Sequence, residues 1–467
     1  MEQIRPLGTF EHFRATLHDL GFHYNVALAG RYDSEDKLLD PKTLYEAVRS
    51  LLKKHPALNV TIRESLDGHP GFVRLPNVDL DNVIRYRHEA RYEQERDKAL
   101  DSILAEENST GFDMASNNPL WRIVIVFNEH TSPPDLIQAP KAADIIFIWH
   151  HAIGDGHSGL FILYDMLDIL NSPPATTKST NAVLAPALEA LLKMPTSIQS
   201  RVRRLSTSIF GDWSVEPPTK KWSGADYQAD PPVKTCIQHI RVPHTSVAAL
   251  SSRCRTEHVS ITALMQTLVR DVLFTTFSDA DNLRCATAIS LRRFMSAPEY
   301  QVDARVMGMW VSAFHIEYPL PLQGDGHSIG DFSWDDARKN KTRIDREVAK
   351  GDTDAETGAL RAIKDFKATM MAKLGNQRQD SFAVTNLGVV PSLTSASSSS
   401  SSSWKLTDVV FSQSCHVNGS AIQFCIISTE GGDMVVSLSS QQGIVPQKDL
   451  DMIAEDLQKR LVALGKS

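Results

Sequence analysis

The chain has 467 residues, of which 42% are hydrophobic and 22% charged, and its formal net charge is -7. At about 150 residues per domain, this length predicts two or three lobes rather than one compact unit. The composition is that of a folded globular protein. The acidic balance, without a long basic tract, argues against a protein built to bind nucleic-acid phosphates.

Membrane and metal-binding classes are also disfavoured. The longest apolar runs, 123–127 and 145–149, are far shorter than the about 20 residues that a membrane-spanning helix needs. The N-terminal segment lacks the apolar stretch of a secretory signal, so we expect a cytoplasmic protein. The five cysteines are widely spaced and include no Cys-x-x-Cys pair, which favours reduced buried thiols. We therefore expect no disulfide framework and no bound metal.

The first part of the chain predicts helices and strands in alternation. A helix is expected to begin at Pro41, with Asp40 as its N-cap. Two dense apolar runs, 120–127 and 144–149, predict neighbouring buried strands. The second of these leads directly into 150–156, and an apolar helix with leucines on one face follows. The segment 150–156 is therefore predicted to form a turn between a strand and a helix.

Composition predicts where the lobes meet. Residues 173–232 are rich in Pro, Ser, Thr and Lys, which is typical of a long connection. This predicts an N-terminal lobe over 1–172 and a C-terminal lobe over 233–467. Strands and helices alternate again in the second lobe, beginning with a strand near 236–242.

The end of the chain predicts a loop and a helix. The segment near 395–403 includes seven consecutive serines, whose side chains cannot form a core, so we expect a mobile surface loop with a strand on either side. After Pro446, leucines and an isoleucine recur on one helical face, with charged residues elsewhere. That face is expected to dock on the core rather than on a membrane.

The turn after the second apolar strand has the clearest chemical signal. His150 and His151 are followed by Asp155, which lies between Gly154 and Gly156. A neutral imidazole, with a pKa of ~6.5 in water, can accept the proton of a hydroxyl or amine as that group attacks. A carboxylate at the far end can hold the turn through an ion pair, and glycines permit a close approach that a Cβ would block. The pattern predicts a turn that orients one histidine as a general base.

Other interpretations of this segment are weaker. The histidines could be ordinary core or surface residues after a strand. A metal site could use both of them with Asp155 and His157, but neighbouring residues of a strand point to opposite faces. A serine nucleophile at Ser158 would need a glycine where Leu160 stands.

The segment His150–Gly156 resembles the core motif of the HHxxxDG acyltransferases, which include chloramphenicol acetyltransferase and the condensation domains of peptide synthetases. Further segments resemble this superfamily in the same order along nearly the whole chain, and several of them resemble its fungal alcohol acetyltransferase branch: Arg5–Gly8 with Glu11, Phe112–Asp113, Pro119–Arg122, Ser290–Arg293, Gly308 with Val311–Ser312, and Thr385–Gly388. The glycine-rich C-terminal motif of the plant members has no counterpart here.

The resemblance implies an α/β fold of two chloramphenicol-acetyltransferase-like lobes. Each lobe is expected to be an α+β two-layer sandwich, and the two form a pseudo-dimer with the active-site tunnel between them. It also implies transfer of an acyl group, most simply acetyl, from acetyl-CoA or another acyl-CoA to the hydroxyl of a small-molecule alcohol or secondary metabolite. The attack would be direct, with no permanently bound cofactor.

Three alternatives stay open under the same resemblance. The acyl donor could be held by an acyl carrier protein, the acceptor could be an amine, or the protein could be a catalytically idle relative that binds a metabolite. The motif gives no direct information on oligomeric state, and a monomer is the default because two lobes already form one site.

The resemblance also assigns roles to residues. His151 would be the general base, Asp155 would hold the catalytic turn, and His150, Gly154 and Gly156 would support it. The partner of Asp155 would be an arginine of the second lobe, for which Arg292 is the first candidate and Arg293 the second. Asn386 is a candidate for substrate binding or for the oxyanion.

Overall fold

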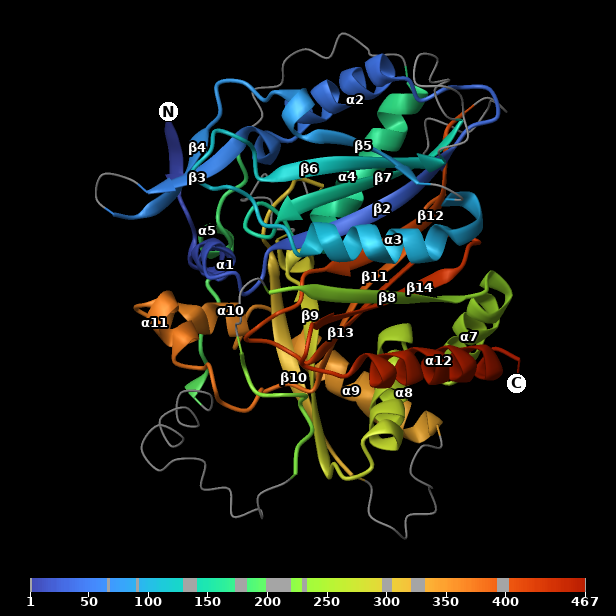
Figure 1. Cartoon of the computed structure of the whole chain (residues 1–467). Helices are drawn as coiled ribbons and strands as arrows, with labels where there is room; N and C mark the ends of the chain where they lie inside the picture. Colours follow the sequence, from blue (N-terminus) through green and yellow to red (C-terminus); the bar gives the residue numbers. More distant parts are fainter. Residues whose placement is uncertain are drawn as a thin grey trace.

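The computed structural model shows two large sheets stacked one above the other, with a small sheet at one side (Figure 1). It describes residues 2–64, 68–89, 92–128, 141–172, 183–198, 220–228, 233–295, 305–320, 332–392 and 403–466. The segment 393–402, which holds most of the predicted serine-rich loop, and most of the predicted connection 173–232 lie outside these residues. The strands β11 and β12 that flank the serine-rich segment are as predicted.

The first large sheet has the strand order β12-β2-β7-β6-β5. Its strands are β2 (Asn25–Asp33), β5 (Ile84–Glu89), β6 (Trp121–Asn128), β7 (Ala142–His150) and β12 (Lys405–Gln413). The strands β6 and β7 are neighbours, as predicted, and they pair in antiparallel orientation. The helices of this half are α2 (Pro41–Lys54), α3 (Tyr92–Asn108) and α4 (Gly156–Asn171). The carboxylate of Asp40 caps α2 by accepting the Thr43 backbone N–H at 2.9 Å.

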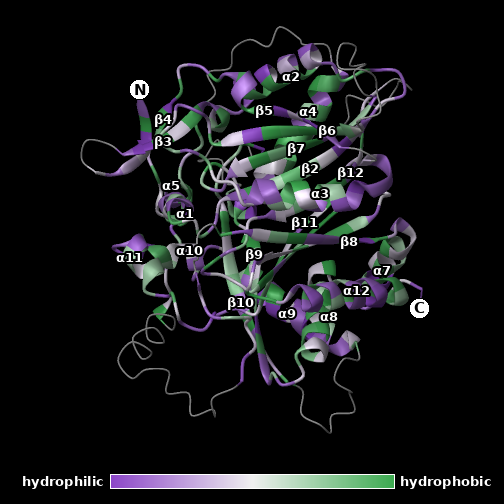
Figure 2. Ribbon diagram, viewed as in Figure 1, coloured by the Kyte–Doolittle hydropathy of each residue, from purple (hydrophilic) through white to green (hydrophobic). Residues whose placement is uncertain are grey.

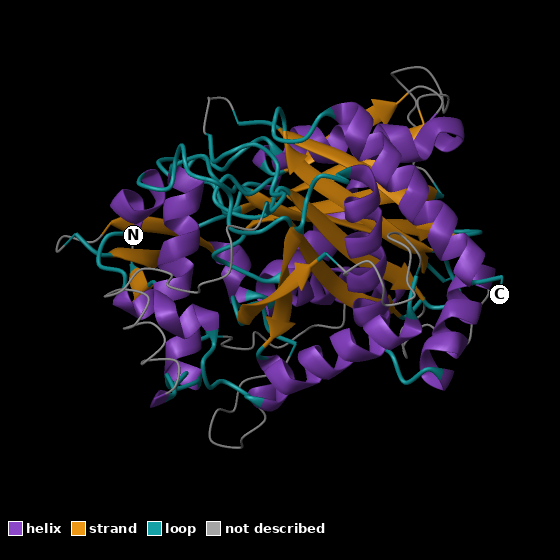
Figure 3. Ribbon diagram, turned by 90° about the horizontal axis from the view of Figure 1, so that it is seen from below, coloured by secondary structure: helices purple, strands orange, loops and turns teal. Residues whose placement is uncertain are grey.

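The second large sheet has the order β10-β9-β11-β13-β14-β8. Its strands are β8 (Thr235–Val242), β9 (Asn282–Ser290), β10 (Val311–Pro319), β11 (Phe382–Val390), β13 (Ile422–Thr429) and β14 (Met434–Gln441). Its helices are α7 (His244–Thr256), α8 (Ile261–Thr276), α9 (Trp334–Ala349) and α12 (Gln447–Leu464). Seen from below, helices lie along the outer sides of the strands (Figure 3). The apolar face of α12 is buried in the core of this half, as predicted.

Short elements complete the side of the molecule near the N-terminus. The small sheet has the order β1-β4-β3, with β1 (Gln3–Pro6), β3 (Val60–Glu64) and β4 (Pro70–Arg74). The helices α1 (Thr9–Asp19), α5 (Leu188–Leu191), α10 (Glu356–Ala359) and α11 (Phe366–Met371) lie below it (Figure 1). Short 3-10 turns are η1 (Pro56–Asn59), η2 (Leu80–Asn82), η3 (Arg292–Phe294) and η5 (Leu360–Ala362).

One strand corrects the predicted division of the chain. Residues 405–413 form β12, which pairs with β2 of the first sheet although the prediction placed all of 233–467 in the second lobe. Composition marks linkers but does not reveal which distant strand completes a sheet, because that pairing is a non-local contact. Side chains of β13 and β14, including Cys425 and Val435, are buried in the same apolar cluster as the first sheet. The halves therefore share a core along β12.

The distribution of apolar residues explains this arrangement. The strands at the centre of the molecule are mostly green, or hydrophobic, whereas α9 is largely hydrophilic (Figure 2). A strand covered on both faces buries every side chain, and each residue of β13 and of β14 is buried. None of the helices in the described ranges is both long and apolar enough to cross a membrane.

Candidate active site

The histidine motif forms the turn between β7 and α4. The strand ends at His150, and α4 begins at Gly156 with Asp155 as its N-cap. The Asp155 carboxylate accepts the backbone N–H of Ser158 at 2.9 Å, which supplies a partner for the first turn of the helix. Asp155 therefore fixes the end of the turn at the point where α4 begins.

His151 is held in one tautomer by its own turn. Its Nδ1 lies 3.1 Å from the Gly154 carbonyl oxygen, which can only accept, so Nδ1 carries the hydrogen and donates it. This leaves the lone pair on Nε2. The residue is 7% exposed and lines a cavity. Burial, followed by the nearby positive charge of Arg14, lowers the pKa of His151 to about 3. The imidazole is therefore neutral and able to accept a proton at physiological pH.

His150 has a different environment, on the opposite side of the strand end. Its Nδ1 accepts the backbone N–H of Ala152 at 2.9 Å, and its ring centroid lies 4.5 Å from that of His18. It is fully buried, and this burial holds its pKa well below the usual value. Neighbouring strand residues point to opposite faces, so the two histidines are not brought to one site. His150 is placed where it supports the turn.

Asp155 pairs with an arginine from the other half of the molecule. Arg292, in the 3-10 turn η3 after β9, donates from Nη2 and Nε to the two carboxylate oxygens at 2.9 and 3.2 Å. The backbone N–H of Trp310 donates to the same carboxylate at 3.2 Å. Burial opposes ionisation, but the charge and hydrogen bonds of Arg292 outweigh it and hold the pKa of Asp155 below its usual value. Arg293, the second candidate, is exposed.

Ser158, the alternative nucleophile, belongs to this ion-pair network. Its hydroxyl donates to the Asp155 carboxylate at 3.0 Å and is itself approached by Arg292 Nη2 at 3.0 Å. The Gly308 carbonyl oxygen and N–H both lie 3.2 Å from the same hydroxyl. Ser158 is fully buried and lies outside the residues that line the cavity. Its contacts position the turn and leave no role as an attacking group.

The cavity beside His151 is formed by both halves of the molecule. It has a volume of about 480 Å3. Its walls come from α1, the turn 151–156, β9, β10, α10 to α11, β11, β12 and the turn at 416–420. The two lobes therefore enclose one chamber, and His151 is the histidine of the motif that reaches it. The C-terminal segment 411–419 contributes Phe411, Gln413 and His416 to the wall.

The two glycines of the motif permit close approach. A Cβ on Gly156 would lie 2.7 Å from Leu387 Cδ2 on β11, and one on Gly154 would lie 2.7 Å from Ser158 Cβ. Contacts this short require the neighbour to move. Gly156 also lines the cavity. A side chain there would press on the strand from the other half as well as on the space near the base.

Asn386 is placed beside the cavity wall rather than in it. Its Nδ2 donates to Thr262 Oγ1 at 3.2 Å, and its Oδ1 accepts the backbone N–H of Gly388 at 2.8 Å. Side chains alternate along β11, so its neighbour Thr385 lines the cavity while Asn386 does not. A role for Asn386 with the substrate or the oxyanion stays a prediction.

Sequence reasoning did not find several polar residues of this chamber. Arg14, Lys373 and His416 line it, and the ring of His23 lies between His151 and His416, at centroid distances of 5.5 and 5.0 Å. These residues come from separate segments, and none belongs to the motif. The family resemblance at the start of the chain covers Arg5–Gly8 and Glu11 but does not include Arg14.

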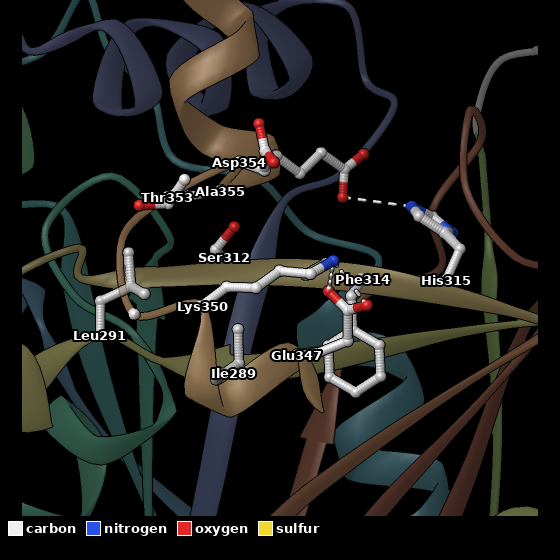
Figure 4. A pocket seen from close by; sticks show the side chains of 13 residues that line it. Ile289, Leu291, Ser312, Phe314, His315, Glu347, Lys350, Thr353, Asp354 and Ala355 are labelled. Atoms are coloured by element: carbon white, nitrogen blue, oxygen red, sulfur yellow. Dashed lines mark hydrogen bonds and ion pairs between the residues drawn. The ribbon is translucent and has the colours of Figure 1, made fainter. Parts of the chain in front are cut away.

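A second cavity adjoins the first along β10. It has a volume of about 380 Å3 and shares Ser312, Ala313, His315 and Glu356 with the chamber of His151 (Figure 4). The Lys350 ammonium at its edge pairs with Glu347 at 2.7 Å. It contains no counterpart of the catalytic turn, so the chamber with His151 is the candidate active site.

The cysteines and acidic clusters give no metal site in the described part of the chain. All five cysteines are free, and no group of three or more His, Cys, Asp or Glu side chains there is arranged to hold an ion.

Two stacked α+β halves, a buried histidine in a chamber between them and a carboxylate–arginine pair behind it define an acyltransferase of the chloramphenicol-acetyltransferase type. A sequence model described as alcohol acetyltransferase matches residues 6–461. Since this covers nearly the whole chain, the protein belongs to the alcohol acetyltransferase family.

Curated relatives and solved structures agree with this family. The chain is 28% identical to a probable alcohol acetyltransferase of Aspergillus fumigatus, over 94% of this chain and 95% of the relative. It is 26% identical to a probable alcohol acetyltransferase of Fusarium pseudograminearum, over 99% and 95% of the two chains.

The fold is similar to that of the trichothecene 15-O-acetyltransferase of Fusarium sporotrichioides, with a TM-score of 0.69 and 13% identity over 98% of this chain and 94% of that one. It is also similar to the first condensation domain of the calcium-dependent antibiotic synthetase, with a TM-score of 0.66 and 13% identity over 99% and 96%. The fold expected from the motif is thereby confirmed.

Proposed function

We propose that this acyltransferase is acyl-CoA-dependent and esterifies the hydroxyl of a small-molecule alcohol or secondary metabolite with an acetyl or other short acyl group. The observation that carries the proposal is the state of His151, whose Nδ1–H is bound to Gly154 and whose Nε2 has no partner among the described residues, in a chamber shared by both halves. The names of the relatives support an alcohol as acceptor. The cytoplasmic location predicted from the sequence stays a prediction.

The first step uses His151 as the general base. As the hydroxyl oxygen of the acceptor attacks the thioester carbonyl, Nε2 takes the hydroxyl proton and the ring becomes an imidazolium. The Gly154 carbonyl accepts the hydrogen of Nδ1 and keeps the ring oriented. The carbonyl oxygen becomes an oxyanion, which a hydrogen-bond donor positioned in the chamber would stabilise.

The second step releases the products. The oxyanion re-forms its C=O bond, the C–S bond breaks, and the imidazolium returns its proton to the departing sulfur. The products are the ester and free CoA, and His151 is neutral again. No group of the protein is acylated in this sequence, which agrees with the position of Ser158 inside the ion-pair network.

Asp155 and Arg292 act as positioning residues. They hold the turn that carries His151 and connect it to the second half. Both carboxylate oxygens are occupied by Arg292 and by backbone or hydroxyl donors, so Asp155 has no free lone pair directed at the ring of His151 among its described contacts. Its effect on the reaction is therefore through geometry and charge.

The test is thiol release from acetyl-CoA by the wild-type protein and by His151→Ala, with a panel of alcohols and amines and product identification by mass. Release that requires a hydroxyl acceptor and disappears in His151→Ala supports the proposal. Release with amines alone would reassign the acceptor. No release from any CoA thioester by a folded protein would overturn the CoA dependence and favour a carrier-bound donor or an idle metabolite binder.

A further inference from the structure

Two positive side chains line the chamber of His151 and form no direct ion pair with any described residue. Arg14 lies on α1 and Lys373 follows α11, two helices that meet through the ring of Phe366, 5.4 Å from that of Phe13. Within the described residues, no carboxylate oxygen lies within 4.0 Å of the charged nitrogens of Arg14 or Lys373. Two half-buried cations therefore face one cavity from different segments, without a carboxylate in direct contact.

The guanidinium of Arg14 is held in place by neutral groups. Its carbon lies 5.1 Å from the ring centroid of Phe10, and its Nη1 lies 3.4 Å from Nε2 of His416. Arg14 Nε and His416 Nδ1 are buried and have no hydrogen-bond partner among the described groups. Burial lowers the pKa of Arg14 to about 10, so the side chain is still charged at neutral pH. Arg14 lines the chamber, and no described group accepts a hydrogen bond from its Nη2.

The carboxylates of the same chamber are already compensated. His315 Nδ1 lies 2.9 Å from Asp380 and its Nε2 lies 3.1 Å from Glu356. Arg284 adds a contact of 3.2 Å to Asp380. Burial opposes protonation of His315, but the two carboxylates outweigh it and raise its pKa to about 9. Glu356 and Asp380 are thus in direct contact with His315 and Arg284, and they attract Arg14 and Lys373 only from a greater distance. The cations of the chamber therefore outnumber its carboxylates.

We infer that Arg14, with His416 beside it and Lys373 on the adjoining wall, binds a carboxylate of the substrate. The inference rests on the proposed acyl transfer in this chamber. A planar guanidinium and a carboxylate form paired, charge-assisted hydrogen bonds, which is the interaction that these unpartnered donors fit. A substrate carboxylate would also supply the missing counter-charge.

The position of this site restricts the source of the carboxylate. The rings of His416, His23 and His151 follow one another at 5.0 and 5.5 Å, so Arg14 is close to the reacting atoms. The pantetheine arm of CoA is much longer than this row of rings, which rules out the CoA phosphates as the bound group. The carboxylate belongs either to a hydroxy-acid acceptor or to a dicarboxylic acyl group such as malonyl. Both would present the same carboxylate group to Arg14.

The experiment separates these two sources. In one arm, acetyl-CoA is combined with a series of hydroxy acids, each matched with its neutral primary amide. In the other, malonyl-CoA is compared with acetyl-CoA on neutral alcohols. The preference for the carboxylate-bearing partner, as a ratio of kcat/KM values, is measured for wild type, Arg14→Gln, Arg14→Lys and Arg49→Gln. Arg49 is an exposed arginine of α2 and serves as the control.

We expect the carboxylate preference in one of the arms to fall roughly 10- to 100-fold in Arg14→Gln. Hydrogen bonds to charged groups contribute about this factor to an equilibrium constant. Arg14→Lys should restore part of the ratio, and Arg49→Gln should leave it unchanged. No preference in either arm, or a preference that Arg14→Gln does not reduce, overturns the inference. Transfer to neutral alcohols would in that case leave the proposed function intact.

A binding measurement keeps the two proposals distinguishable. The hydroxy acids and their amides are titrated calorimetrically into wild type and Arg14→Gln without any donor. Tighter binding of the acids that is lost in Arg14→Gln supports the carboxylate site even if every CoA thioester is inactive. Equal binding of acids and amides, or equal binding by both proteins, counts against it.

Discussion

The carboxylate of Asp155 and the guanidinium of Arg292 connect the two halves at the turn that carries His151. Arg292 Nη2 and Nε lie 2.9 and 3.2 Å from the two oxygens of Asp155, and the side chains are 9% and 0% exposed. The residues are 137 positions apart in the chain. The geometry of His151 therefore depends on a contact that exists only when both halves are assembled.

This relationship predicts a linked loss of stability and activity in Asp155→Asn. The substitution removes the charge but keeps the size, and breaking a buried ion pair by changing one of its partners costs about 3–5 kcal/mol. We expect a lower melting temperature together with reduced turnover. Arg293→Gln, which alters the exposed neighbouring residue, is the control and should change neither. An Asp155→Asn protein of normal stability and normal activity would remove the ion pair from its proposed role.

The role of His151 predicts a different pattern of effects. His151→Ala removes the proton acceptor from the chamber without touching the Asp155 network, so turnover should fall by about 10²–10⁴ or more while the melting curve and CoA binding persist. The exposed His244→Ala serves as the matched control. Turnover is measured by thiol release and CoA binding by calorimetry, for wild type, His151→Ala and His244→Ala. Turnover by a folded His151→Ala protein at the wild-type rate would exclude the mechanism.

The lowered pKa of His151 makes a prediction for pH. Since burial and Arg14 lower it to about 3, the neutral, proton-accepting form predominates from about pH 5 to pH 8. The acid limb of kcat/KM should therefore lie well below the pKa of an ordinary histidine. Arg14→Gln removes the second cause of the shift and should move that limb to higher pH. A wild-type limb near pH ~6.5 would contradict this environment for the base.

The local elements near the site could be predicted from the sequence, but the chamber could not. The turn from His150 to Gly156 is contiguous, and apolar periodicity marks the strand before it and the helix after it. Arg292 was predicted by its resemblance to the family's arginine position, and its contact with Asp155 is present. Arg14 and His416 are 402 positions apart, and their approach depends on how β12 returns to the first sheet. No local pattern encodes that pairing.

Stability should also depend on pH through His239 on β8. Its Nδ1 lies 2.5 Å from Asp101 and its Nε2 lies 3.2 Å from Asp97, both on α3 of the other half. Burial opposes the charge, but these carboxylates outweigh it and raise the pKa of His239 to about 9. A raised pKa stabilises the fold fully below the unfolded value of ~6.5, and the effect is lost as pH rises through about 9.

The measurement is thermal unfolding of wild type and His239→Gln across this pH range. The wild-type melting temperature should decline between about pH 6.5 and pH 9, and part of that slope should be absent in His239→Gln. His315, whose pKa is also raised to about 9, supplies the remainder, and His315→Gln isolates it. Identical slopes for wild type and His239→Gln would show that the α3–β8 contact does not bind the protonated ring.

Gly156 gives the last prediction, because it tests the contact between the catalytic turn and β11. A Cβ at this position would lie 2.7 Å from Leu387 Cδ2, so Gly156→Ala should overpack the junction, cost about 1–3 kcal/mol of stability and displace the turn that carries His151. The partner is a side-chain methyl group, so shortening it should relieve the strain. We expect Gly156→Ala combined with Leu387→Ala to recover activity relative to Gly156→Ala alone, measured by double-mutant analysis of kcat/KM and melting temperature. Additive losses in the double variant would mean that the glycine is required for another reason, namely the open space beside the base.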